Sequence, residues 1–323
     1  DSDRLTQGNV IALYNLMTQI LVELIKLANL IVTVSRAAAC GSRIESVLSM
    51  NSSLELFPES GKEGGRVETT ASEEPPLVRF DGVSMRYKGG GANALTDISF
   101  TVKRGETVGV IGGTGSGKTT LVNLVPHFYD VTEGSVRVDG KDVRAYDPET
   151  LRARIGVVPQ RAVLFKGSIR ENLRWGKGDA TDEELMAAAR VAQAEQVILG
   201  KGGLDAEVEQ GGRNFSGGQR QRLTIARALV RKPEILILDD SASALDYATD
   251  AALRHALASL PDAPAVFVVS QRTSAVRGAD KIVVLDEGRA VGIGTHEQLL
   301  QTCPVYKEIY DSQYKDDGED AAS

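Results

Sequence analysis

The chain has 323 residues, of which 42% are hydrophobic and 25% charged, the composition of a globular protein with one large domain or two smaller ones. Its formal net charge of −7 argues against a nucleic-acid-binding protein, because such proteins usually carry an excess of basic residues. The two cysteines, Cys40 and Cys303, lie far apart and lack the spacing of a metal site, so we expect free thiols in a reducing compartment.

An apolar helix is the first predicted element. Residues 9–36 (NVIALYNLMTQILVELIKLANLIVTVSR) are apolar over more than the ~20 residues that a helix needs to span a bilayer. Glu23 and Lys26 interrupt this stretch at i,i+3 spacing, so they share one helix face and can pair. Arg36 and Arg43 follow, as expected on the cytoplasmic side of a spanning helix. We therefore predict a membrane helix, with an amphipathic soluble helix as the alternative; the length and the lack of a basic start exclude a signal peptide.

The segments around the main domain differ from it in composition. Residues 37–50 continue the helical pattern, whereas residues 51–76 are rich in Ser, Gly, Glu and Pro and predict a linker. Residues 316–323 form an acidic tail that we expect to be disordered. The sequence starts at Asp1 and not at Met, as a fragment or processed product of a longer protein would.

Strand and helix signals alternate from Leu77 onward. Two segments alternate apolar and polar residues like half-buried strands, and five are continuous apolar runs like buried parallel strands. These segments are residues 77–87 and 97–102, and then 106–112, 155–159, 234–239, 265–270 and 281–286. Helical patterns cover residues 118–129, 181–194, 217–231 and 247–259. The alternation predicts an α/β domain with a mainly parallel sheet.

A phosphate-binding loop follows the predicted strand at 106–112. Its sequence, GGTGSGKT, fits the pattern G-x-x-x-x-G-K-[ST] between a strand and a helix. Glycines let the backbone N–H groups point at phosphate oxygens, Lys118 supplies a positive charge, and the Thr119 hydroxyl can ligate Mg²⁺. We expect the phosphates to be bound by Gly113, Thr114, Gly115, Ser116, Gly117, Lys118, Thr119 and Thr120.

A carboxylate ends the apolar run ILIL. Asp239 lies at the carboxyl end of this predicted strand, where it can hold Mg²⁺ directly or through water. The alternative is an aspartate that only caps a helix, and the phosphate loop upstream argues against it. ATP and Mg²⁺ are therefore the predicted cofactors.

The stretch NFSGGQRQRLTIARAL, residues 214–229, decides the subfamily. Together with the phosphate loop it resembles the ATP-binding cassette (ABC) ATPases, whose LSGGQ signature closes over ATP held by the other subunit. Phe215 replaces the leucine of that signature, while Ser216, Gly217, Gly218 and Gln219 are intact. A serine hydroxyl and glycine N–H groups at a helix start form a second phosphate-binding end.

The resemblance implies a fold, partners and further site residues. It implies a RecA-like core with a mainly parallel sheet, an antiparallel β subdomain and a helical signature subdomain over residues 77–315. Residues 1–50 look like the last membrane helix of an exporter half-transporter and its cytoplasmic extension. Tyr87 looks like the adenine-stacking aromatic, with an ordinary strand tyrosine as the alternative, and Gln160 like the glutamine that touches Mg²⁺. Residues 243–246 look like the loop that crosses the dimer interface.

Two positions depart from the family pattern. Asp240 stands where the family has the catalytic glutamate, and Gln271 stands where it has the switch histidine. Aspartate is one methylene shorter, and a misplacement of about 1 Å can cost on the order of 100-fold in rate. Glutamine can hydrogen-bond the γ-phosphate but carries no positive charge. We expect Asp240, Gln271 and Lys118 to form a site that binds ATP well and hydrolyses it slowly.

The three histidines, His127, His255 and His296, lie outside these motifs and are predicted to be structural or surface residues. In a subset of bacterial multidrug-type ABC exporters, a subunit with a degenerate site pairs with a competent one, and its intact signature serves the partner. The resemblance thus implies a plasma-membrane heterodimer with a cytoplasmic nucleotide-binding domain, an unknown transported substrate and no nucleic acid. A soluble ABC ATPase acting on DNA or ribosomes, and a regulatory module without turnover, are the alternatives.

Overall fold

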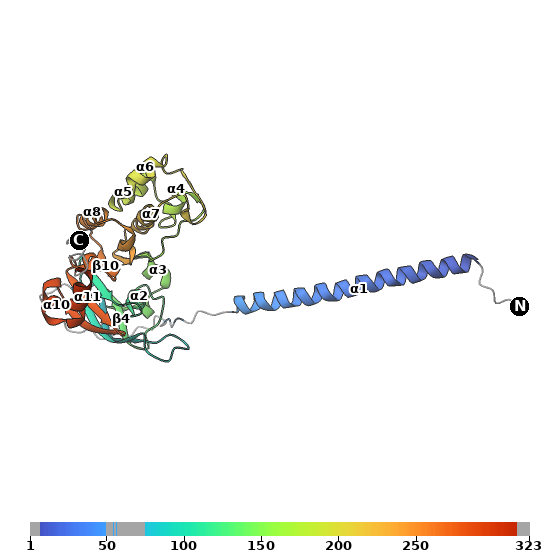
Figure 1. Ribbon diagram of the computed structural model, residues 1–323, viewed down its shortest axis with the longest axis horizontal. Helices are drawn as coiled ribbons and strands as arrows, with labels where there is room; N and C mark the ends of the chain where they lie inside the picture. Colours follow the sequence, from blue (N-terminus) through green and yellow to red (C-terminus); the bar gives the residue numbers. More distant parts are fainter. Residues whose placement is uncertain (1–6, 50–53, 55, 57–74, 315–323) are drawn as a thin grey trace, which may run out of the picture. The chain divides into compact units, whose positions relative to one another are not determined.

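The computed structural model of the chain describes residues 7–49, 54, 56 and 75–314 (Figure 1). These residues divide into two compact units, one before residue 54 and one that begins at residue 54. The predicted linker, residues 51–76, lies almost entirely outside the described residues, and the predicted acidic tail, residues 316–323, lies wholly outside them.

The first unit is one helix, α1 (Gln7–Leu48), of 42 residues. At 1.5 Å per residue it is about 63 Å long, roughly twice the hydrocarbon thickness of a bilayer. Among the described residues it is the one helix long and apolar enough to cross a membrane. The predicted helices at 9–36 and 37–50 are therefore continuous, and the chain passes through Gly41 without a break. Glu23 and Lys26 pair as predicted, with 2.7 Å between Nζ and Oε1.

The second unit contains a six-stranded sheet in the order β12-β11-β3-β10-β9-β6. All neighbours are parallel except β12, which returns from β11 as an antiparallel hairpin. The strands are β3 (Thr107–Gly112), β6 (Ile155–Val158), β9 (Ile235–Asp239), β10 (Ala265–Ser270), β11 (Lys281–Asp286) and β12 (Arg289–Gly294). Every residue of β9 and β10 is buried, which is why their sequences are continuous apolar runs.

A second, antiparallel sheet has the order β2-β1-β4-β5. Its strands are β1 (Val78–Met85), β2 (Leu95–Val102), β4 (Glu133–Val138) and β5 (Lys141–Asp142). A further two-residue pair, β7 (Gly167–Ser168) with β8 (Glu207–Val208), lies among helices. The helices are α2 (Lys118–Asn123), α3 (Pro148–Ala153), α4 (Ile169–Arg174), α5 (Asp182–Val191), α6 (Glu195–Gly200), α7 (Gly217–Leu229), α8 (Tyr247–Ala258), α9 (Thr273–Val276), α10 (His296–Thr302) and α11 (Pro304–Tyr314).

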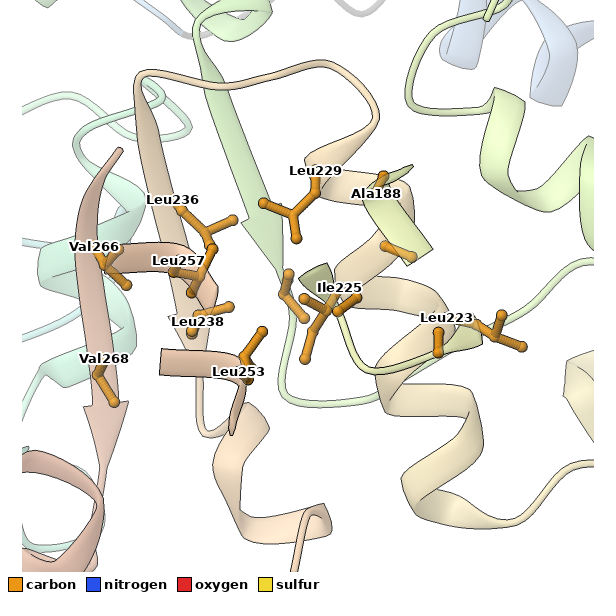
Figure 2. Packing of buried hydrophobic residues seen from close by; sticks show 14 of the residues in the cluster. Ala188, Leu223, Ile225, Leu229, Leu236, Leu238, Leu253, Leu257, Val266 and Val268 are labelled. Carbon is orange, nitrogen blue, oxygen red and sulfur yellow. The ribbon is translucent and has the colours of Figure 1, made fainter. Parts of the chain in front are cut away.

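Alternate residues of β9 belong to two different hydrophobic cores. Leu236 and Leu238 pack in the cluster that includes α7 and α8, whereas Ile235 and Ile237 pack on the other face with α2 and the antiparallel sheet. Figure 2 shows the first cluster, in which Leu253 and Leu257 of α8 and Ile225 of α7 lie beside β9 and β10. The parallel sheet is thus covered on both faces, and the carboxyl ends of β3, β9 and β10 lie at one edge of it.

The predicted helix at 118–129 is shorter than expected. α2 ends at Asn123, and the next backbone N–H groups bond three residues back instead of four. Pro126 cannot donate a backbone hydrogen bond, and His127 has a φ of 53°, in the left-handed region that ends a helix. The sequence pattern continued because Leu124 and Val125 are buried without being helical interior residues.

Candidate functional site

The loop between β3 and α2 depends on glycines for its shape. Gly115 and Gly117 have φ values of 81° and 98°, which only glycine adopts readily. A Cβ on Gly117 would lie 2.8 Å from the Ala94 carbonyl oxygen, and one on Gly112 would lie 2.1 Å from the Leu285 carbonyl oxygen. The sequence therefore folds this loop tightly against β11 and the start of β2. Ser116 is buried in it, and its hydroxyl has no hydrogen-bond partner in the described structure.

Lys118, the first residue of α2, folds its side chain back over the loop. Its Nζ donates to the carbonyl oxygens of Gly112 and Gly113 at 2.8 and 2.6 Å. Burial lowers the pKa of this ammonium group, and the charges of Asp240 and Asp239 oppose the shift. The ammonium is thus held at the mouth of the loop, where phosphate oxygens can replace the carbonyls as its partners.

Thr119 and Asp239 meet although 120 positions separate them. The Thr119 hydroxyl lies 3.1 Å from both carboxylate oxygens of Asp239. Burial raises the pKa of Asp239; the hydrogen bond from Thr119 opposes this, and the charge of Asp240 adds to it. The Lys118 charge favours the ionised form of this carboxylate only weakly against its burial. A hydroxyl beside a buried carboxylate suits Mg²⁺, which typically binds one or two carboxylates together with phosphates.

Asp240 and Gln160 are joined by a hydrogen bond that the sequence did not reveal. The Gln160 amide donates to Oδ2 of Asp240 at 3.1 Å. Asp240 has a φ of 46°, and its N–H donates to the Val269 carbonyl of the neighbouring strand at 2.9 Å. Left-handed backbone is tolerated better by aspartate and asparagine than by most residues. The aspartate at this position therefore suits its backbone conformation.

One cavity of about 330 Å³ brings most of the predicted residues together. Gln271 enters it from the end of β10, beside Asp240 at the end of β9. The predicted residues that line it are Tyr87, Thr114, Gly115, Gly117, Lys118, Thr119, Thr120, Gln160, Asp239, Asp240 and Gln271. Gly113 and Ser116 belong to the same loop without lining the cavity, and Ser216, Gly217, Gly218 and Gln219 lie outside it.

Tyr87 is held at the rim of this cavity by two contacts. Its hydroxyl and that of Thr120 are 2.8 Å apart, and its ring and that of Tyr129 form a T-shaped pair at a centroid distance of 5.2 Å. The residue is 41% exposed, so surface remains for a ligand. Sequence reasoning missed Tyr129, because its contact with Tyr87 depends on the path of the chain after α2.

The SGGQ segment forms the start of α7. The Ser216 hydroxyl accepts from the Gln219 N–H at 3.3 Å, and the Gln219 side chain accepts from the Ser216 N–H at 3.0 Å. Ser216 and Gly217 are exposed. Phe215 is buried, with the Lys201 ammonium 5.0 Å from its ring centroid, so the aromatic residue fills a core position in place of leucine. The start of α7 is thus an open helix end away from the phosphate loop of its own chain.

The three histidines lie outside the cavity, as predicted. His127 is buried, with its Nε2 2.7 Å from Oδ1 of Asp130. The Nδ1 of His296 lies 2.7 Å from the Tyr306 hydroxyl. His255 is exposed on α8.

Comparison with known proteins agrees with this geometry. Residues 95–243 match the family model described as ABC transporter. The chain contains an ABC transporter ATP-binding domain. The predicted ABC ATPase fold is thereby confirmed, together with the long apolar helix that precedes the ABC domain.

The relatives of this ABC domain are longer proteins. The chain is 42% identical over 321 residues to an uncharacterized ABC transporter ATP-binding protein of Mycobacterium tuberculosis, covering 97% of this chain and 53% of the relative. It is 43% identical over 237 residues to the putative multidrug export ATP-binding/permease protein YgaD of Bacillus subtilis, covering 73% of this chain and 41% of the relative. A solved bacterial Atm1-family ABC exporter with ATP bound matches with a TM-score of 0.78 at 30% identity, over 97% of this chain and 54% of that chain. The chain therefore spans about half the length of the curated relatives that it matches along its whole sequence.

Proposed function

We propose that the chain is the ATP-binding and ATP-hydrolysing part of an ABC exporter half-transporter. In this proposal α1 is the last membrane helix with its cytoplasmic extension, residues 77–315 are the nucleotide-binding domain, and the protein resides in the plasma membrane with that domain in the cytoplasm. The observation that carries the proposal is the convergence of the Gly112–Thr119 loop with Asp239 in one cavity. The exporter names of YgaD and the Atm1-family structure support it, and neither they nor α1 favour a soluble ATPase or a purely regulatory module.

The predicted residues that line the cavity have separate roles in this proposal. The loop from Gly113 to Thr120 binds the phosphates, with Lys118 on the β- and γ-phosphates, and Tyr87 stacks on adenine. Thr119 and Asp239 hold Mg²⁺, with Gln160 beside them. Mg²⁺ would neutralise charge that develops on the phosphates.

Asp240 and Gln271 take the places of the groups that orient water and stabilise the γ-phosphate. The Asp240 carboxylate lies close to its own backbone and is bonded by Gln160, so it reaches less far into the cavity than glutamate would. Gln271 can donate a hydrogen bond but adds no positive charge. We therefore infer a site that holds ATP and turns it over slowly.

The open start of α7 supports a division of labour between two subunits. Ser216 and Gly217 are exposed and lie outside the cavity of their own chain. The Ser216 N–H is bonded to Gln219, but the Ser216 O–H and the Gly217 N–H can donate to ATP on a second half-transporter. An intact signature beside a weakened catalytic pair suits a heterodimer in which the partner holds the competent site.

Replacing Ser216 with alanine is expected to lower ATP turnover of the heterodimer about 10-fold, because the partner's γ-phosphate loses a hydroxyl donor in a desolvated site. Steady-state phosphate release from the chain with its natural partner half-transporter measures the loss. The matched control is Thr295→Ala, which removes an equivalent capping box with Gln298 at the start of α10. Equal losses in both variants would mean that Ser216 acts only as a helix cap.

Membrane insertion of α1 can be tested by cysteine accessibility in the parent protein. On a helix, Gln19 lies on the same face as Glu23 and Lys26, whereas Leu21 lies on the opposite face. In a Cys40→Ser background, Gln19→Cys in membrane vesicles is expected to react at least ~10-fold faster than Leu21→Cys with a water-soluble maleimide, because intramembrane charges face a bundle or water path. Equal rates would indicate a soluble amphipathic helix.

A further inference from the structure

The segment that presents Gln271 to the cavity is short and lacks a cap of its own. It joins β10 to α9, a helix of four residues whose N-cap, Arg272, makes no side-chain capping bond. Ser270 and Thr273 are buried on either side, while Gln271 is exposed at the cavity. Within the segment, the Ser270 hydroxyl accepts from the Arg272 N–H at 3.0 Å. Hydrogen bonds within the segment alone therefore do not satisfy all the backbone N–H groups at the start of α9.

Gln313, near the end of α11, supplies the missing partners from 40 residues away. Its Oε1 accepts from the Thr273 N–H at 2.9 Å and from the Thr273 hydroxyl at 3.0 Å. Its Nε2 donates to the Gln271 carbonyl oxygen at 2.8 Å. Only this orientation of the amide satisfies all three bonds. In a flipped amide the NH₂ group would face the Thr273 N–H, and the amide oxygen would face the Gln271 carbonyl oxygen.

We propose that Gln313 is a positioning residue for the side chain at position 271. One planar amide bonds the carbonyl of residue 271 and the N–H of residue 273, so it fixes the backbone on both sides of Arg272. The direction in which residue 271 points into the cavity follows from that backbone. Gln313 does not itself line the cavity, so it acts on the ATP site through the segment and not by contact with the nucleotide.

This inference rests on the proposed function, because it gives residue 271 a part in ATP turnover. Catalytic groups must be held within a fraction of an ångström, and a shift of about 1 Å can cost on the order of 100-fold in rate. Loss of the Gln313 bonds frees one side of the segment and should displace residue 271 by less than about 1 Å. We therefore expect kcat to fall about 10-fold. The KM for ATP should stay unchanged, because the phosphate loop and Tyr87 are untouched.

The experiment compares Gln313→Met, Gln313→Glu and Gln301→Ala. Methionine keeps the length and loses all three bonds, whereas glutamate keeps the two acceptor bonds to Thr273 and loses the donor to Gln271. Gln301 is exposed on α10 and serves as the matched control. Amide hydrogen exchange at Thr273 should accelerate about 10-fold in Gln313→Met, less in Gln313→Glu, and not in Gln301→Ala.

Turnover is measured in the chain that carries Asp240→Glu with Gln271→His, because we expect this chain to hydrolyse ATP faster and a loss to be followed more easily. Gln313 bonds the backbone of residue 271, so its contact survives that replacement. We expect kcat to be highest with Gln313 in place, lower in Gln313→Glu and lowest in Gln313→Met, at constant KM and constant ATP affinity. Faster exchange at Thr273 with an unchanged kcat would overturn the positioning role, and so would unchanged exchange. A chain that binds no ATP before any change at Gln313 would instead contradict the proposed function.

Discussion

Replacing Lys118 with alanine is expected to weaken Mg-ATP binding by at least ~100-fold. Lys118 now donates two hydrogen bonds at the mouth of the phosphate loop, and each charge-assisted hydrogen bond is worth about 1.5–3 kcal/mol. Its loss also leaves the carboxylates of Asp239 and Asp240 in the cavity without the ammonium group that offsets them. A triphosphate would then enter a more negative site.

Isothermal titration of ATP in the presence of Mg²⁺ measures this loss. The matched control is Lys103→Ala, which removes an exposed lysine between β2 and β3, outside the cavity. An ATP affinity in Lys118→Ala equal to that of the control would refute the assignment of the phosphate site.

Combining Asp240→Glu with Gln271→His is expected to raise ATP turnover of the isolated chain by ~10–100-fold. Glutamate carries its carboxylate further from the backbone, toward the position of the attacking water, and histidine can hold a proton beside the γ-phosphate. In the proposed division of labour, a dimer of the unaltered chain contains two slow sites, so we expect it to release phosphate slowly even when concentrated. The glutamate must adopt the left-handed backbone at position 240, which costs stability but leaves the Val269 hydrogen bond in place.

The matched control for this gain is Asp240→Asn with Gln271→His, which keeps the shorter side chain and removes the carboxylate. Its turnover should lie below that of the unaltered chain. If instead the unaltered chain alone releases phosphate as fast as it does with a partner half-transporter, Asp240 is a working base despite its length, and the division of labour fails.

The parts of the fold and site that could be predicted are those with a local physical cause. The apolar run ILIL is too short for a typical helix and has the length of a buried strand, so it predicts β9 and places Asp239 at its end. The glycines of the phosphate loop adopt φ values that other residues avoid, so their spacing predicts the turn. The Ser216 and Gln219 pair is a capping box, and it marks the start of α7.

The remaining parts depend on contacts between distant segments. The end of α2 at Asn123 follows from the backbone of His127, while the apolar pattern runs on. The bond from Gln160 to Asp240 spans 80 positions, and the bonds from Gln313 span about 40. Glutamines on a helix or loop carry no signal of their distant partners, because an exposed glutamine has the same sequence pattern. Phe215 likewise departs from the family pattern, and its burial explains the change only once the packing is known.

The unbroken course of α1 determines where this long helix can bend. Sharp bends in helices occur mainly at proline, at glycine–serine pairs or where the hydrogen-bond ladder is interrupted. The one such pair in α1 is Gly41–Ser42, and a Cβ on Gly41 would meet no atom within 4 Å in the described structure. This pair lies beyond the apolar residues 9–36, so the most compliant point of the helix falls outside the stretch that can occupy the bilayer. A force that acts on the end near Leu48 would therefore bend the helix at Gly41–Ser42 before it distorted the apolar segment.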